Sequence, residues 1–292
     1  MTAKPRTLKP TANIVIPVMG ATGSGKSYFI NKLLEATGNN DRVEVGRELA
    51  SCTSKINPIK IKGLTSKYPT LKGRDVTIVD TPGFDDSVVS DFEIVKRIAT
   101  WLKKSCERGS VLGGVLYLHD MSQDRFSGAT RRNLDHFNLL CGEPCLRKAV
   151  ILTTKWGGAD GRDFEKIETD LQANHWATMI QKGARTSRLD AKDECASARS
   201  IVDSLLGGVA SGPVGQKLLE EVLQIQEELV HQKMPLQETM IAEALRKELE
   251  EMMDGVTDEA RLIGIRAQVK ELWESIARRV TRVTTALRQL RS

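Results

Sequence analysis

The chain has 292 residues and a formal net charge of +5, with 43 lysines and arginines against 38 aspartates and glutamates. Aromatic residues make up 4%, which argues against a nucleic-acid surface built from interleaved basic and aromatic side chains. No run approaches the roughly 18 uninterrupted apolar residues of a membrane span. The five cysteines are scattered and odd in number, so reduced thiols and a cytoplasmic location are expected, without a metal cluster.

The N-terminal segment, residues 1–12, carries three basic residues but no apolar stretch ahead of a cleavage site, so we interpret it as a disordered leader. An apolar run at 14–19 follows and predicts a buried strand, while 26–37 has helical spacing. The segment between them is rich in glycine, which allows the backbone conformations that aim successive N–H groups at a phosphate. The candidate nucleotide-binding residues here are Gly20, Ala21, Thr22, Gly23, Ser24, Gly25, Lys26, Ser27 and Tyr28.

Two side chains of this loop carry further chemistry. The Lys26 ammonium supplies positive charge at the β- and γ-phosphates of a nucleotide, and the Ser27 hydroxyl is placed to ligate Mg²⁺. A strand, a phosphate-binding loop and a helix in this order indicate a nucleoside triphosphate site.

The remaining elements continue the alternation. Shorter apolar runs predict strands, and the stretches between them have helical period. This pattern predicts an α/β three-layer sandwich, with a mostly parallel sheet between helices and the ligand at the carboxyl ends of the strands. The predicted strands are 56–61, 75–79, 111–118 and 149–153, and the predicted helices are 92–106, 128–140, 163–174 and 193–206.

Two motifs belong to the phosphate and metal side of the site. The strand at 76–79 leads into Asp80-Thr81-Pro82-Gly83, in which Asp80 orients Mg²⁺ and the Gly83 N–H faces the γ-phosphate. Thr53, in a polar loop before the strand at 56–61, is the candidate second hydroxyl ligand, with Thr65 and Ser54 as alternatives. The predicted metal ligands are therefore Ser27, Thr53 and Asp80.

These motifs, together with Ser51-Cys52-Thr53 and the run from Asp80 to Asp86, resemble the septin-related GTPases, which include the animal immunity-associated and plant chloroplast outer-membrane GTPases. The segments 117–120, 125–128 and 152–156 are similar to a set of uncharacterised fungal proteins in that group. The resemblance covers roughly residues 13–206. It implies a P-loop G domain, GTP and GDP as ligands, Mg²⁺ as cofactor, and a homodimer that pairs across the nucleotide faces.

The sequence departs from the GTPase pattern at two positions. Phe84 follows Gly83, where a glutamine orients water in Ras-like enzymes, so slow hydrolysis is expected and no residue is assigned as catalytic; His119 and Arg125 are read as structural. Thr154, Lys155 and Trp156 are assigned to the base, but Gly157 stands where GTPases carry the aspartate that selects guanine. ATP is therefore an alternative ligand, Asp160 a candidate substitute, and Gly183 with Ala184 the expected opposite wall.

The chain changes character after Gly207-Gly208, where we expect a break between the G domain, 13–206, and a helical extension, 207–292. Three apolar runs with heptad-like spacing follow, at 218–229, 241–252 and 262–290. They predict a hairpin or coiled coil, or helices folded back on the G domain. The last run has a basic polar side, so the extension is a candidate contact for a protein partner or an anionic membrane surface. The hypotheses are a slow GTP-hydrolysing switch or assembling GTPase, a non-hydrolysing oligomeric scaffold, or an ATP-binding protein.

Overall fold

The computed structural model describes residues 11–45, 55–85, 89–123, 126–157, 163–254 and 263–270. The metal-ligand candidate Thr53, its alternative Ser54, the residues Arg125 and Asp160, and most of the leader and of the last heptad-like run lie outside these ranges.

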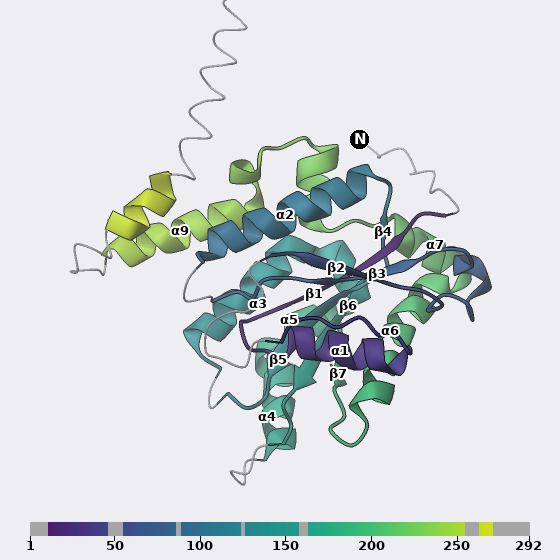
Figure 1. Ribbon diagram of the computed structural model, residues 1–292. Helices are drawn as coiled ribbons and strands as arrows, with labels where there is room; N and C mark the ends of the chain where they lie inside the picture. The colour runs from purple at the N-terminus through teal and green to yellow at the C-terminus, as the bar shows by residue number, and fades with distance from the viewer. Residues whose placement is uncertain are drawn as a thin grey trace, which may run out of the picture.

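A mixed sheet forms the centre of the molecule (Figure 1). Its strands follow the order β2-β3-β1-β5-β6-β7, with the short β4 beside β1. The β2–β3 pair is antiparallel and the other pairs are parallel. The carboxyl ends of β1, β3, β5, β6 and β7 therefore meet at one edge. The strands are β1 Ile14–Gly20, β2 Asn57–Ile61, β3 Val76–Asp80, β4 Val111–Leu112, β5 Val115–Asp120, β6 Ala149–Thr154 and β7 Arg185–Arg188.

Helices cover both faces of this sheet, and each face has its own apolar core. One core joins the sheet to α1 and α6, and the other joins it to α2, α3 and α9 (Figure 1). The predicted three-layer arrangement is confirmed. The α-helices are α1 Lys26–Ala36, α2 Asp91–Glu107, α3 Gly128–Cys141, α4 Phe164–Asp170, α5 Ala177–Gln181, α6 Glu194–Ala210, α7 Gly212–Glu220, α8 Gln224–Gln226 and α9 Met240–Asp254.

Two of the predicted elements are divided in the structure. The run at 111–118 forms two strands, β4 and β5, because Gly113 and Gly114 pass close to their neighbours: a Cβ at Gly113 would lie 2.4 Å from Ile14 Cγ2. The predicted helix at 163–174 is α4 followed by a π-helical turn, Leu171–His175.

The helix does not end at Gly207-Gly208, where the sequence predicted a break, because α6 continues through both glycines to Ala210. Val209 is buried with Leu205 and Leu206, so the apolar stripe of α6 extends past the glycines. Burial of one such side chain contributes roughly 1.5–3 kcal/mol and offsets the cost of about 1 kcal/mol for each helical glycine. The division into domains at this point stays a prediction.

The helices α7, α8 and α9 pack back onto the elements that precede them. Leu219 of α7 joins the core of α1 and α6, whereas Leu223, Ile225, Leu229, Ile241 and Leu245 join the core of α2 and α3. The first heptad-like run is not one helix, because the buried Lys148 Nζ donates to Leu218 O at 2.6 Å and to Glu221 O at 2.8 Å. These carbonyls bond to the ammonium where α7 ends.

Candidate functional site

The phosphate loop lies between β1 and α1 at the carboxyl edge of the sheet. Gly23 and Gly25 have φ of 77° and 90°, values that favour glycine. The Lys26 side chain lies inside the turn, where Nζ donates to Gly20 O at 3.1 Å and to Ala21 O at 2.8 Å. Thr22 Oγ1 and Ser24 Oγ are buried without a hydrogen-bond partner among the described residues. A buried ammonium and orphaned hydroxyls fit an anion with several acceptor oxygens.

The metal-side residues lie beside this loop. Ser27 Oγ donates to Asp80 Oδ2 at 2.6 Å, and Asp80 is fully buried at the end of β3. Burial raises the pKa of Asp80, while the Ser27 hydrogen bond and the charge of Lys26 lower it. Asp80 Oδ1 has no partner within the described ranges. A hydroxyl beside a carboxylate with a spare oxygen suits Mg²⁺, which prefers oxygen ligands and keeps several waters.

The alternative hydroxyl from Thr65 is wrong for this role. Thr65 follows β2, which runs antiparallel to β3 with Asn57 opposite Asp80. The chain therefore reaches Thr65 at the other edge of the sheet, where Thr65 Oγ1 donates to Arg74 O at 2.7 Å.

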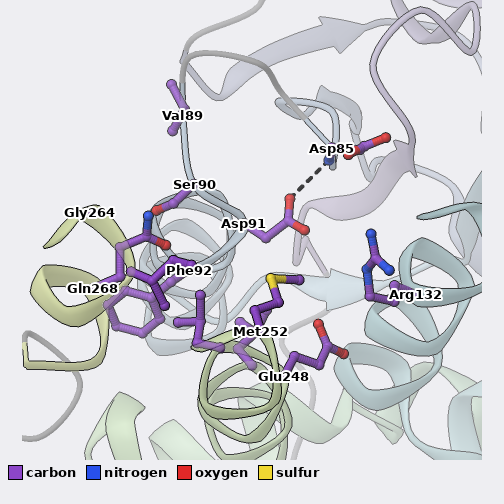
Figure 2. Close-up of a pocket in the computed structure, with 13 residues that line it drawn as sticks. Asp85, Val89, Ser90, Asp91, Phe92, Arg132, Glu248, Met252, Gly264 and Gln268 are labelled. Carbon is purple, nitrogen blue, oxygen red and sulfur yellow. Dashed lines mark hydrogen bonds between the residues drawn. The ribbon is translucent and has the colours of Figure 1, made fainter. Parts of the chain in front are cut away.

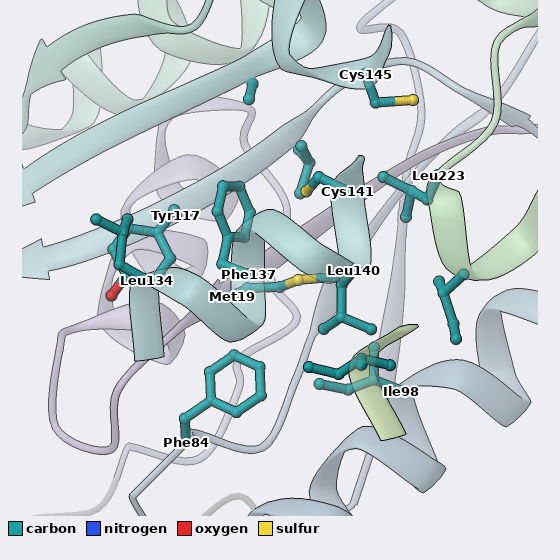
Figure 3. Close-up of a cluster of buried hydrophobic side chains, with 14 of the residues drawn as sticks. Met19, Phe84, Ile98, Tyr117, Leu134, Phe137, Leu140, Cys141, Cys145 and Leu223 are labelled. Carbon is teal, nitrogen blue, oxygen red and sulfur yellow. The ribbon is translucent and has the colours of Figure 1, made fainter. Parts of the chain in front are cut away.

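The turn after β3 lies directly against the phosphate loop. Thr22 N donates to Phe84 O at 2.9 Å, and Phe84 N donates to Gly20 O at 3.3 Å. A Cβ on Gly83 would lie 2.5 Å from Thr22 N. The position after Gly83 points into the core, where Phe84 is fully buried near Met19 and Phe137 (Figure 3). Phe84 therefore anchors the turn and offers no polar group to a nucleotide.

Beyond Phe84, contacts that the sequence pattern did not indicate lead to α9. Asp85 N donates to Asp91 Oδ1 at 2.9 Å, and the buried His136 ring lies edge-on to Phe84 with its Nε2 3.1 Å from Glu248 Oε1. Burial raises the pKa of Asp91. Asp85, Asp91 and Glu248 line a pocket of about 490 Å³ that reaches α9 (Figure 2). His136 and Glu248 are 112 positions apart in the chain, so no local sequence pattern could indicate this pair.

The residues that the sequence assigns to the base lie at the end of β6. Thr154 Oγ1 donates to Ser24 O at 2.9 Å and so ties β6 to the phosphate loop. Lys155 has a φ of 59°, and its Nζ lies 2.6 Å from Asp120 Oδ2. The Trp156 indole N–H donates to Thr153 Oγ1 at 3.1 Å. The Arg188 guanidinium lies over the Trp156 ring, with Arg188 Cζ 4.2 Å from the ring centroid.

The opposite wall is not where the sequence analysis placed it. Gly183 and Ala184 precede β7, and a Cβ on Gly183 would lie 2.8 Å from Arg147 Cγ. Because β7 runs parallel to β6, its nucleotide-side end is Arg188. The residues after it, 189–193, therefore lie beside the end of β6.

Among the described helices, none combines the length and the apolar character that a membrane span needs.

Known proteins share this architecture. Residues 15–138 match the model of the family described as 50S ribosome-binding GTPase. Toc33 from Arabidopsis thaliana in complex with GDP and Mg²⁺ is similar with a TM-score of 0.51 and 15% identity, covering 69% of this chain and 85% of that chain. The complex of the same protein with Mg²⁺ and GMPPNP gives 0.50 and 16%, covering 69% and 86%.

A further similar structure is reported with the statement that dimerization is important for the GTPase activity of the chloroplast translocon components atToc33 and psToc159. It has a TM-score of 0.50 and 16% identity, covering 69% of this chain and 84% of that one. No curated protein matches this chain. The chain has the P-loop GTPase fold, and its residues 15–138 match the model of a GTPase family.

Proposed function

We propose that this protein binds guanine nucleotides with Mg²⁺ and hydrolyses GTP slowly to GDP and phosphate, as a molecular switch or an assembling GTPase. The observation that carries the proposal is the Ser27–Asp80 pair beside Lys26, with an orphaned carboxylate oxygen at the carboxyl edge of the sheet. The match of residues 15–138 to a GTPase family supports guanine over adenine.

Each part of the site has a role in this proposal. Backbone N–H groups of the phosphate loop and the Lys26 ammonium bind the phosphates, with Tyr28 at the start of α1 near the sugar. Gly83 N–H contacts the third phosphate, while Thr154, Lys155 and Trp156 border the base. Ser27, Thr53 and Asp80 would hold Mg²⁺, which supplies charge neutralisation at the phosphates.

The buried Phe84 supports slow turnover. At this position a glutamine would orient the attacking water, but the Phe84 side chain lies in the core and has no hydrogen-bonding group. A second protomer docked across the nucleotide face would supply the missing group in trans. The described relation between dimerization and activity in atToc33 and psToc159 favours this arrangement.

The same observation favours a second candidate, a scaffold that retains the nucleotide without hydrolysing it and assembles through its C-terminal helices. In either case, those helices are the proposed contact for a protein partner or a membrane surface. ATP binding is the remaining alternative, because Gly157 offers no carboxylate.

The test uses the nucleotide-stripped full chain. Calorimetry with GTP, GDP and ATP in the presence of Mg²⁺ measures affinity, and phosphate release is followed over a range of micromolar protein concentrations. We expect GTP to bind more tightly than ATP, with release per chain rising with concentration. Lys26→Ala removes the cation at the phosphates and is expected to weaken GTP binding at least tenfold.

The matched control is Lys217→Ala, at an exposed position on α7, which should leave binding and release unchanged. If neither triphosphate binds in a Lys26-dependent manner, the proposed function is refuted. If GTP binds but no phosphate release depends on Lys26 at any protein concentration, the result supports the scaffold.

A further inference from the structure

The base side of the site lacks a carboxylate where selection of guanine requires one. Guanine presents two hydrogen-bond donors on one edge, N1–H and the 2-amino group, whereas adenine does not. A carboxylate that accepts both discriminates strongly, because the wrong base leaves it unpaired. Gly157 cannot do this, and a Cβ built there would meet no atom of the described residues within 4 Å.

Asp190 lies just after the end of β7, the strand that pairs with β6. The last paired residues of β6 and β7 are Thr153 and Arg188, and Leu189 N extends the pairing with a 2.9 Å hydrogen bond to Thr153 O. Continuing this register places Asp190 level with Lys155. Leu189 is buried whereas Asp190 is exposed, so the chain turns out of the core between them.

The loop that contains Asp190 also lies next to the start of α1. Glu194, in the first turn of α6, accepts a hydrogen bond from Tyr28 Oη at 2.5 Å and pairs with Lys32 at 3.3 Å. Tyr28 directly follows the metal-side Ser27. The loop is thus bordered by the end of β6 and by the helix that carries the phosphate-binding residues.

Hydrogen bonds hold the loop in one conformation. Ser197 Oγ accepts from Asp190 N at 3.0 Å and donates to Arg188 O at 3.1 Å. Asp190 Oδ1 accepts from Lys192 N at 3.0 Å. For the other carboxylate oxygen, no partner is recorded among the described residues. An acceptor held in this way loses little conformational freedom when it binds a base.

Five other carboxylates described near the ends of β6 and β7 already bond to neighbouring groups, as one oxygen of Asp190 does. They bond to cations, to hydroxyl groups or to the first N–H groups of a helix. They are Asp120 with Lys155 and Ser122, Asp163 with the N-terminus of α4, Glu165 and Glu168 with Arg188, and Asp193 with the N-terminus of α6.

We propose that Asp190 selects the base: its carboxylate accepts hydrogen bonds from N1–H and the 2-amino group of guanine, in the role that Gly157 leaves open on the adjacent strand. This inference rests on the proposed function and specifies how the same site reads its ligand. A carboxylate supplied from β7 instead of β6 preserves guanine selection without an aspartate at position 157.

Xanthosine triphosphate tests the proposal, because xanthine has a carbonyl at C2 where guanine has an amino group. An amide can donate to that carbonyl and still accept from N1–H. Affinities for GTP, xanthosine triphosphate and ATP with Mg²⁺ are measured by calorimetry on the full chain. We expect Asp190→Asn to bind GTP about 100-fold more weakly and xanthosine triphosphate at least tenfold more tightly than the parent chain.

Two further variants complete the experiment. Asp193→Asn changes a carboxylate in the same loop and keeps a good N-cap for α6, so it should behave as the parent chain. Asp160→Asn tests the rival residue from the sequence and is also expected to behave as the parent. Any one of three results overturns the proposal. The first is an Asp190→Asn variant that keeps the parental preference for GTP, and the second is one that loses GTP binding without gaining affinity for xanthosine triphosphate. The third result is a reversed preference between these two nucleotides in Asp160→Asn.

These results separate the two levels of inference. A parent chain that binds GTP in a Lys26-dependent manner, with an Asp190→Asn variant of unchanged preference, refutes the role of Asp190 alone. A parent chain that binds no purine triphosphate refutes the proposed function as well. The gain of binding in the variant also shows that it is folded.

Discussion

Replacing Gly83 by alanine tests the close contact between the turn after β3 and the phosphate loop. Gly83 does not have a positive φ, so alanine is compatible with its backbone. Its Cβ, however, would lie 2.5 Å from Thr22 N and 2.6 Å from Thr22 Cα, which are backbone atoms that no rotamer change can move aside. The turn must therefore shift, and the hydrogen bond from Thr22 N to Phe84 O weakens.

The expected cost follows from these contacts. Overpacking costs about 1–3 kcal/mol and the loss of a backbone hydrogen bond about 1 kcal/mol, so Gly83→Ala should lower the free energy of unfolding by about 3 kcal/mol. For a chain of this length that corresponds to a fall in Tm of roughly 6–12 °C. Thermal unfolding of the nucleotide-free full chain, followed by circular dichroism, measures it.

Function should change in the same variant. Because we assign the Gly83 N–H to the third phosphate, Gly83→Ala should weaken GTP binding more than GDP binding in calorimetry. The control is Gly208→Ala in α6, where a Cβ would meet no atom of the described part of the chain within 4 Å. That substitution should raise stability by about 0.5–1 kcal/mol. A Gly83→Ala protein as stable as its parent would refute the close approach.

Two further substitutions test other parts of the fold. Lys148→Met removes the ammonium that donates to Leu218 O and Glu221 O, whereas the hydrogen bond from Glu221 N to Leu218 O remains. The substitution should lower the free energy of unfolding by about 2–4 kcal/mol in urea titrations, whereas Lys217→Ala should not; equal midpoints would contradict the role of the ammonium. Burial lowers the pKa of His119 from 6.5 to about 4. Its stabilising contribution is therefore fully present above about pH 6.5 and is lost as the pH falls toward 4, because the unfolded chain takes up the proton first. His119→Phe should flatten the stability profile over that interval by about 3 kcal/mol; parallel profiles for parent and His119→Phe would refute this.

The sequence by itself determined the features that depend on neighbouring residues. The glycines around Lys26 and Ser27 set the phosphate loop, since only they allow its backbone conformation, and the apolar runs marked buried strands because their residue pattern is local. Asp80 and Gly83 could be placed beside the loop because the carboxyl ends of parallel strands meet at one edge.

Only the tertiary structure decided which surfaces meet. Heptad-like spacing is satisfied equally by a partner helix or by a helix layer of the same domain, and the buried Ile241 and Leu245 of α9 show the second outcome. The contact of His136 with Glu248 and the position of Asp190 beside the end of β6 depend on strand order and helix packing. Those are long-range choices, made by the apolar faces that bury one another, and no local pattern records them.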